Sequence, residues 1–258
     1  MSRSVGVVVP AYRPDVSVLS TYVRDLVATL APDAVRIELD APEPGVVEAL
    51  ADLPATVSTA PRRRGKGAAV TAGFEALETD VLSFFDADGS TPADSAADVL
   101  APVCRGEADL SVGSRRHPDA EILGHQTFAR RRLGDGFAWV ARQLLGVSLY
   151  DFQCGAKALT REAWATVRDH IYEPGFAWDV ELIAMAAAFD FRIAETPIAW
   201  EDRPGSTVSP VETALSMGKA LLLARHRAKR LGDSRLHDAI AARREGSTTL
   251  VDRERDRR

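Results

Sequence analysis

Strand-like and helix-like segments alternate from residue 5 to about residue 115, and this alternation constrains the fold more than any other feature. Short apolar runs typical of buried strands are separated by stretches with apolar residues at helical spacing. We expect strands at 5–9, 35–39, 55–58, 81–85 and 110–113, and helices at 17–30, 46–53, 67–77 and 95–104. This order predicts an α/β fold with a mostly parallel central sheet flanked by helices.

The remaining residues are less regular. Their patterns predict helices at 128–145, 162–169, 180–189 and 211–230 and a strand at 193–200. We therefore expect residues 1–230 to form one domain. Residues 231–258 are rich in charge and lack a core-forming pattern, so we expect a charged, partly mobile C-terminal tail.

Composition excludes several classes of function. The net charge of −5 gives no basic surface for nucleic acid, so we expect no nucleic-acid partner. No stretch reaches the roughly 18 apolar residues that a membrane span needs. The two cysteines have neither metal-ligand spacing nor the number that a disulfide framework requires, which favours a cytoplasmic protein.

Two acids, Asp86 and Asp88, follow the apolar run 81–85. Side chains alternate along a strand, so an extended backbone would direct both carboxylates to one side. Carboxylate oxygens suit Mg²⁺ or Mn²⁺, which in turn suits a bound diphosphate. By itself a pair of acids at a strand end is also ordinary turn chemistry, and the motif is short.

Neighbouring segments add to this edge. Asp40 ends the second expected strand, so it would reach the same crevice as the acid pair, or else cap a turn. The segment 62–67 (RRRGKG) opens a helix, and its cations and glycines suit an anionic phosphate, although a solvated basic loop is the alternative. A dinucleotide-binding turn is excluded, because Pro10, Ala11 and Tyr12 end the first strand where that motif needs glycines.

Seven motifs in order make the chain resemble family 2 glycosyltransferases of the GT-A fold: VVVPAYR, GKGAAVTAGFEAL, DADGSTP, GSRRH, DFQCGAKAL, WDVEL and AWEDRPGS. Among these enzymes it looks most like the dolichyl-phosphate glucose and mannose synthases. The resemblance implies inverting transfer of a hexose from a nucleotide diphosphate sugar to dolichyl or polyprenyl phosphate. UDP-glucose is the favoured donor and GDP-mannose the alternative, with Mg²⁺ or Mn²⁺ as cofactor.

The resemblance also implies roles for individual residues. Asp86 and Asp88 would hold the metal, and Arg115 and Arg130 would hold the acceptor phosphate. The positions matching the nucleotide and sugar pockets are Pro10, Ala11, Tyr12, Asp40, Lys66, Gln153, Asp179 and Glu181. Gly134 departs from the family, whose members often carry serine there.

The acceptor decides whether a general base is needed. A phosphate is anionic near neutral pH and attacks without one, so arginines need only align it. Asp179 is then a sugar-positioning or helix-capping residue. If the acceptor were a soluble sugar or another small hydroxyl, Asp179 would be the candidate base.

Two readings from other classes are disfavoured. A sugar-1-phosphate nucleotidyltransferase needs a glycine-rich signature after the first strand, and a non-catalytic binding module has no need of the acid pair.

Since the acceptor is expected to be a lipid, we expect peripheral contact at the cytoplasmic face of the membrane. The segment 211–230, apolar and then basic, would lie at that interface or else pack on the domain as an ordinary helix.

Overall fold

The computed structural model describes residues 3–123, 128–201, 210–231 and 248–256. Within these ranges only the backbone is described at 123, 128–133, 210–217 and 230. No helix in this part of the chain is long and apolar enough to cross a membrane.

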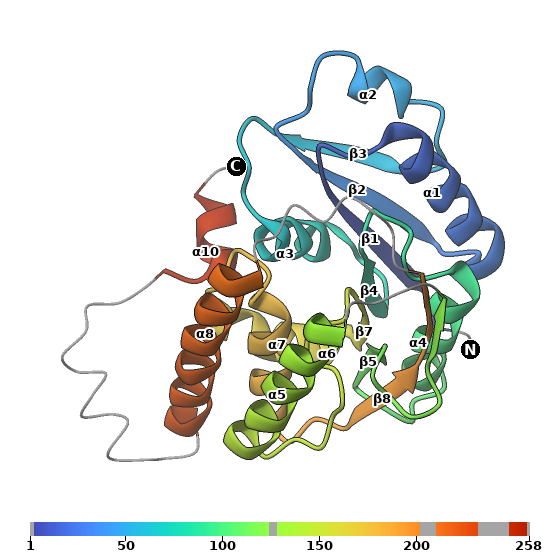
Figure 1. Cartoon of the computed structure of the whole chain (residues 1–258). Coiled ribbons are helices and arrows are strands. Elements are labelled where there is room, and N and C mark those ends of the chain that lie inside the picture. The colour runs from blue at the N-terminus through green and yellow to red at the C-terminus, as the bar shows by residue number, and fades with distance from the viewer. Residues whose placement is uncertain (1–2, 124–127, 202–209, 232–247, 257–258) are drawn as a thin grey trace.

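A seven-stranded sheet in the order β3-β2-β1-β4-β7-β5-β8 forms the centre of the molecule (Figure 1). Six strands run parallel, and β7 alone is antiparallel to its neighbours β4 and β5, so the expected mostly parallel sheet is confirmed. A second, two-stranded sheet pairs β6 with β9. The strands are β1 (Val5–Tyr12), β2 (Ala34–Asp40), β3 (Thr56–Ala60), β4 (Val81–Phe85), β5 (Leu110–Ser114), β6 (Glu121–Leu123), β7 (Ala156–Thr160), β8 (Ile193–Pro197) and β9 (Ala199–Glu201).

Helices cover both faces of the sheet (Figure 1). Alternate residues of β1 enter different cores: Val7 and Val9 pack with α1 and α4, whereas Val8 packs with α3 and α7. Outside α7 lie α8 and then α5. The helices are α1 (Val16–Leu30), α2 (Val46–Ala49), α3 (Lys66–Ala76), α4 (Ala93–Cys104), α5 (Phe128–Leu145), α6 (Arg161–Val167), the short 3-10 helix η1 (Arg168–His170), α7 (Trp178–Ala188), α8 (Pro210–Leu231) and α10 (Leu250–Arg255).

The sequence pattern missed β6, β7 and α10. Strand β7 occupies the middle of the sheet, but its small residues and Lys157 lack the apolar signal of a central strand. Part of the expected tail is also ordered. Leu250 and Val251 of α10 are buried in the core that α3 and α7 share, and the Leu250 N–H donates to the Ile171 carbonyl at 2.9 Å. Leu250 and Val251 are a single apolar pair in a charged segment, so α10 has no helical periodicity that the sequence could reveal.

Candidate functional site

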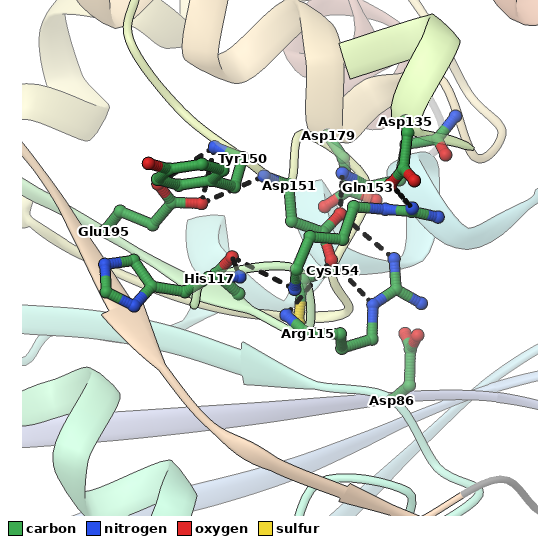
Figure 2. Close-up of polar contacts among 12 residues, drawn as sticks. Asp86, Arg115, His117, Asp135, Tyr150, Asp151, Gln153, Cys154, Asp179 and Glu195 are labelled. Atoms are coloured by element: carbon green, nitrogen blue, oxygen red, sulfur yellow. Dashed lines mark hydrogen bonds and ion pairs between the residues drawn. The ribbon is translucent and has the colours of Figure 1, made fainter. Parts of the chain in front are cut away.

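The topology brings the sequence-predicted residues to one edge of the sheet. Because β1, β2, β4 and β5 are parallel, their carboxyl ends lie together at Tyr12, Asp40, Asp86 and Arg115. The antiparallel β7 adds the loop before its first residue to the same edge, which contains Asp151, Gln153 and Gly155. Helix α7 contributes Asp179 from the layer above (Figure 2).

Asp86 and Asp88 lie at this edge, but not through strand alternation. Strand β4 ends at Phe85, and residues 87 and 88 form a turn in which the Ser90 N–H donates to Asp88 Oδ1 at 2.9 Å. The expectation of an extended backbone is therefore wrong. The two acids still interact: burial raises the pKa of Asp86, Lys66 opposes that rise, and the charge of Asp88 adds to it.

The Asp86 carboxylate lies against backbone that has no side chain. The Asp86 N–H donates to the Gly155 carbonyl at 2.9 Å, and a Cβ atom at Gly155 would overlap the carboxylate oxygens. The Asp86 side chain remains 38% exposed and Asp88 is exposed, so both offer oxygens to a ligand. The described residues hold no cluster of three potential metal ligands among His, Cys, Asp and Glu. These two acids therefore fit a hard cation that takes its other ligands from a substrate and water.

Two lysines surround Asp179. Lys66 Nζ lies 3.0 Å from Asp179 Oδ2 and 3.0 Å from Asp86 Oδ1, while Lys157 Nζ lies 2.7 Å from Asp179 Oδ1. Burial raises the pKa of Asp179, but Lys157 and Lys66 outweigh burial and hold it below its usual value. A carboxylate 1% exposed with an ammonium on each oxygen is poorly suited to be a general base.

Arg115, the residue after β5, lies near Asp86. Its guanidinium binds Asp151 through two hydrogen bonds, from Nε at 2.7 Å and from a terminal nitrogen at 3.1 Å. Figure 2 shows the guanidinium between Asp151 and Asp86. Glu195 of β8 in turn accepts the N–H groups of Tyr150 and Asp151, which fixes the loop that carries Asp151.

A small polar hollow of about 150 Å³ lies beside Arg115. Arg116 enters it and pairs with Asp135 at 2.6 Å, in space that a side chain at Gly134 would fill. Arg130 lies in the first turn of α5, and its side chain is outside the described residues. The hollow is lined by Arg115, Arg116, His117, Pro118, Ala120, Ile122 and Asp135.

The residues predicted to bind the nucleotide lie at the ends of β1 and β2. The sheet register places Tyr12 beside Asp40. Tyr12 is 37% exposed, and the Arg63 guanidinium lies 4.4 Å from the centre of its ring. Pro10 and Ala11 precede it in β1.

Asp40 is engaged by the basic loop itself. Its carboxylate is 2% exposed and accepts the N–H groups of Arg64 and Gly65 and the Arg64 Nε, at 2.6, 3.0 and 2.7 Å. Asp40 therefore orders the loop before α3.

The loop at Pro174 covers part of the N-terminus of α3, and the phosphate site expected there stays a prediction. The Ala68 N–H donates to the Pro174 carbonyl at 3.1 Å, and a Cβ atom at Gly65 would overlap the same carbonyl. Of the cations in this segment, Arg64 binds Asp40 and Glu38, and Lys66 reaches the acid group.

Glu181 makes its contacts with α8 and with the loop before α7, and its expected place beside the sugar stays a prediction. Two positions apart on α7, Glu181 and Asp179 leave the helix on different sides. The Glu181 carboxylate accepts hydrogen bonds from the N–H groups of Tyr172 and Glu173 at 2.8 Å each. It also forms an ion pair with Arg227 of α8. Burial raises the pKa of Glu181, against the opposing charge of Arg227. Gln153 lies in the loop before β7, and its N–H donates to Asp151 at 3.0 Å.

The sequence analysis missed three contributors. Asp151 and Lys157 lie within the DFQCGAKAL motif, and Lys157 is one of only four lysines in an arginine-rich chain. Lys157 is fully buried, which implies an anionic partner, but the sequence alone shows neither the burial nor the partner. Arg64 carried no signal that separated it from Arg62 and Arg63.

Comparison with known proteins places these features in context. The family model described as "Glycosyl transferase family 2" matches residues 7–160. The chain is 34% identical over 160 residues to "Glycosyltransferase AglD" of Haloferax volcanii, which covers 62% of this chain and 25% of that protein. It is 33% identical over 180 residues to "Dolichyl-phosphate beta-glucosyltransferase" of Mus musculus, covering 66% and 54%. The chain thus spans about half of the mouse relative and a quarter of AglD.

Solved structures support the same architecture. A crystal structure of glucosyl-3-phosphoglycerate synthase from Mycobacterium tuberculosis, in complex with Mn²⁺, uridine-diphosphate-glucose and phosphoglyceric acid, matches with a TM-score of 0.63. The two chains are 18% identical, and the match covers 86% of this chain and 80% of that one. This likeness confirms the GT-A fold that the motifs predicted.

Proposed function

Because this chain belongs to glycosyl transferase family 2, we propose that it transfers a hexose from a nucleotide diphosphate sugar to the phosphate of a dolichyl or polyprenyl lipid, with inversion. The observation that carries the proposal is the Asp86 carboxylate at the sheet edge, two residues before Asp88, with the Arg115 guanidinium lying between Asp86 and Asp151 (Figure 2). The names of the curated relatives, dolichyl-phosphate beta-glucosyltransferases from several organisms, favour glucose and hence UDP-glucose as donor.

The donor would bind along the ends of β1, β2 and β4. Pro10, Ala11 and Tyr12 would contact the nucleoside, and Asp40 would order the adjoining loop. Asp86 and Asp88 would hold Mg²⁺ or Mn²⁺, which neutralises the charge that develops on the leaving diphosphate. Gln153, in the loop before β7, is proposed to contact the hexose.

The acceptor phosphate would bind on the Arg115 side, with Arg130 as the second cation. A guanidinium fork matches phosphate oxygens, and Asp151 holds Arg115 in a fixed orientation toward the acid pair. An aligned phosphate attacks the anomeric carbon directly, and a single displacement inverts its configuration. The engagement of both Asp179 oxygens by lysines fits this route and disfavours the soluble-hydroxyl alternative, which requires Asp179 as a base.

The test is incubation with UDP-glucose or GDP-mannose, a polyprenyl phosphate and Mn²⁺ or Mg²⁺, with the lipid product identified by mass. We expect a lipid-phosphate hexose, formed faster from UDP-glucose. Replacing both acids (Asp86→Asn with Asp88→Asn) should reduce turnover at least roughly a hundredfold, by analogy with the loss of a main electrostatic stabiliser. Asp98→Asn, at an exposed position on α4, is the matched control. Absence of lipid product from every donor, or transfer to a soluble hydroxyl instead, would contradict the proposal.

A lipid acceptor requires the protein to approach a membrane, and we propose peripheral contact at the cytoplasmic face. Exposed apolar side chains on α5 and α8 support this, notably Trp139 at 61% and Leu222 at 59% exposure. Residues 218–231 of α8 also pack on the domain through Ala220, Leu221 and Ala224, so the helix contacts the protein on one side and leaves the other available.

A further inference from the structure

One ammonium group serves two carboxylates at the sheet edge. Lys66 Nζ lies 3.0 Å from an oxygen of Asp86 and 3.0 Å from an oxygen of Asp179. The two carboxylates depend on it differently. Asp179 has a second cation, Lys157, at 2.7 Å, whereas Asp86 has no other cation at salt-bridge distance among the described residues. Lys66 is therefore the group that neutralises Asp86.

Burial makes this pairing strong. The side chains of Lys66 and Asp179 are 7% and 1% exposed, while that of Asp86 is 38% exposed. The two lysines and the two aspartates cancel in charge. A divalent cation that binds Asp86 enters next to a fixed ammonium that already contacts the same carboxylate, and the two positive charges repel. Asp88 offers the cation a second carboxylate, but at Asp86 itself the cation and Lys66 compete until another anion takes the ammonium.

From this contact we propose that Lys66 competes with the divalent cation for Asp86, and that the diphosphate of the donor ends the competition by taking the ammonium onto its own oxygens. The inference rests on the proposed function, and it concerns how the donor site is assembled. The metal then binds more tightly when the nucleotide diphosphate is bound, and the nucleotide diphosphate binds more tightly when the metal is bound. Positive coupling of this kind acts equally on both ligands.

The surroundings of Lys66 allow it to change partners. A lysine carries its charge on a flexible four-carbon stem, so a small rotation moves the ammonium by several ångströms. When it leaves Asp86, the buried Asp179 remains paired with Lys157, and Asp86 gains the metal. No buried charge is left without a partner at either stage.

Replacing Lys66 separates its competition with the metal from its binding of the diphosphate. In Lys66→Met, Mn²⁺ binding without nucleotide should tighten by roughly tenfold, the equivalent of about 1.4 kcal/mol, because the competitor is gone. Binding of UDP in saturating Mn²⁺ should weaken by roughly tenfold, since the diphosphate loses a cation. The ratio of the Mn²⁺ dissociation constants without and with UDP should therefore fall. Titration calorimetry, with electron paramagnetic resonance to count free Mn²⁺, gives each constant.

Lys66→Gln repeats the test with a polar side chain in case the methionine variant unfolds, and circular dichroism checks both. Lys219→Met removes a lysine from an exposed position on α8 and should change neither constant. Mn²⁺ binding alone that is unchanged or weaker in folded Lys66 variants, or an unchanged coupling ratio, would overturn the inference and leave the proposed function intact. If the wild-type protein binds no UDP even with Mn²⁺, the proposed function fails, and this inference with it.

Discussion

At the scale of single residues, the missing side chain at Gly155 determines where the Asp86 carboxylate lies. A Cβ atom there would overlap both carboxylate oxygens. In Gly155→Ala we expect the carboxylate to turn away from the edge, so that Mn²⁺ affinity in the presence of UDP falls by roughly tenfold, about 1.4 kcal/mol. Titration calorimetry measures it.

Gly136→Ala on α5 is the matched control, because a Cβ atom at that position meets nothing within 4 Å. It should leave Mn²⁺ affinity unchanged. Equal affinities in Gly155→Ala and the wild type would show that the position of this carboxylate does not depend on the glycine.

Asp151 gives a pH-dependent prediction. Burial raises its pKa, but the charge and hydrogen bonds of Arg115 outweigh burial and hold the pKa well below its usual value. The stabilisation is therefore complete above the unfolded-state pKa of roughly 3.9 and is lost as pH falls toward the lower folded-state value. Asp151→Asn should cost about 2 kcal/mol of unfolding free energy at pH 7, the worth of hydrogen bonds to a charged group.

That difference should shrink as pH is lowered from 5 toward 2, because the Asp151 carboxyl takes up a proton in the unfolded wild-type chain below roughly pH 3.9, which favours unfolding, whereas the amide of the variant does not titrate. Denaturant unfolding at a series of pH values measures it. Glu107→Gln, which breaks an ion pair whose side chains are 58% and 57% exposed, serves as control and should have little effect at any pH. A difference that stays constant with pH would show that the Asp151 charge is not the cause.

At the scale of elements, Glu181 links α8 to the loop that covers α3. Arg227 of α8 pairs with Glu181, whose carboxylate holds the N–H groups of Tyr172 and Glu173, and the adjoining Pro174 carbonyl accepts from Ala68. Lys66 is the first residue of that helix. Arg227→Gln should lower the unfolding free energy by about 2 kcal/mol, because a buried carboxylate loses its cation. It should also weaken UDP binding severalfold by loosening α3.

Arg225→Gln lies two positions earlier on α8, on a different side of the helix, and should change neither quantity. Calorimetry and denaturant unfolding read both variants. Lost stability with unchanged UDP affinity in Arg227→Gln would show that α8 is not coupled to the donor side.

Elements with a strong periodic pattern were predicted accurately from the sequence. The bounds expected for β4 and α5 match those observed, and most other elements differ by a few residues at their ends. The expected strand 193–200 is instead two strands, β8 and β9, which belong to different sheets. Strand β7 was missed because its central position is decided by its neighbours and not by its own composition.

The residues of the site likewise divide into those that the sequence could predict and those that only the tertiary fold brings together. Asp40 and Asp86, at or just after the ends of parallel strands, were predicted to lie together because such strands bring their carboxyl ends to one edge, whereas Arg115 was predicted from the family resemblance. Partners joined only by the tertiary fold were not: Asp151 holds Arg115, and Lys157 holds Asp179, across the sheet and the α7 layer. No local pattern encodes such pairs.

At the scale of the whole molecule, exposed apolar side chains on α5 and α8 predict binding to vesicles. These helices pack against one another, and Trp139 and Leu222 are mostly exposed. Replacing both by serine should weaken binding to anionic lipid vesicles by at least roughly tenfold, because insertion of large apolar side chains supplies much of interfacial affinity. Sedimentation with vesicles measures this.

Phe176→Ser is the control, since Phe176 is 46% exposed and lies outside both helices. An equal loss in this variant, or unchanged binding in the double variant, would locate the lipid-facing surface elsewhere on the molecule.

Strand β7 follows β4 and β5 in the chain and runs antiparallel to both, which has a consequence for folding during synthesis. It inserts between β4 and β5, two strands that are synthesised more than 40 residues before it. Until residues 156–160 leave the ribosome, each of those strands presents an unpaired edge, and nascent chains of that length are open to edge-to-edge association. The segment that fills this gap in the sheet also carries Asp151 and Lys157, so the partner of Arg115 arrives with β7, and the partner of Lys157, Asp179, follows when α7 is added.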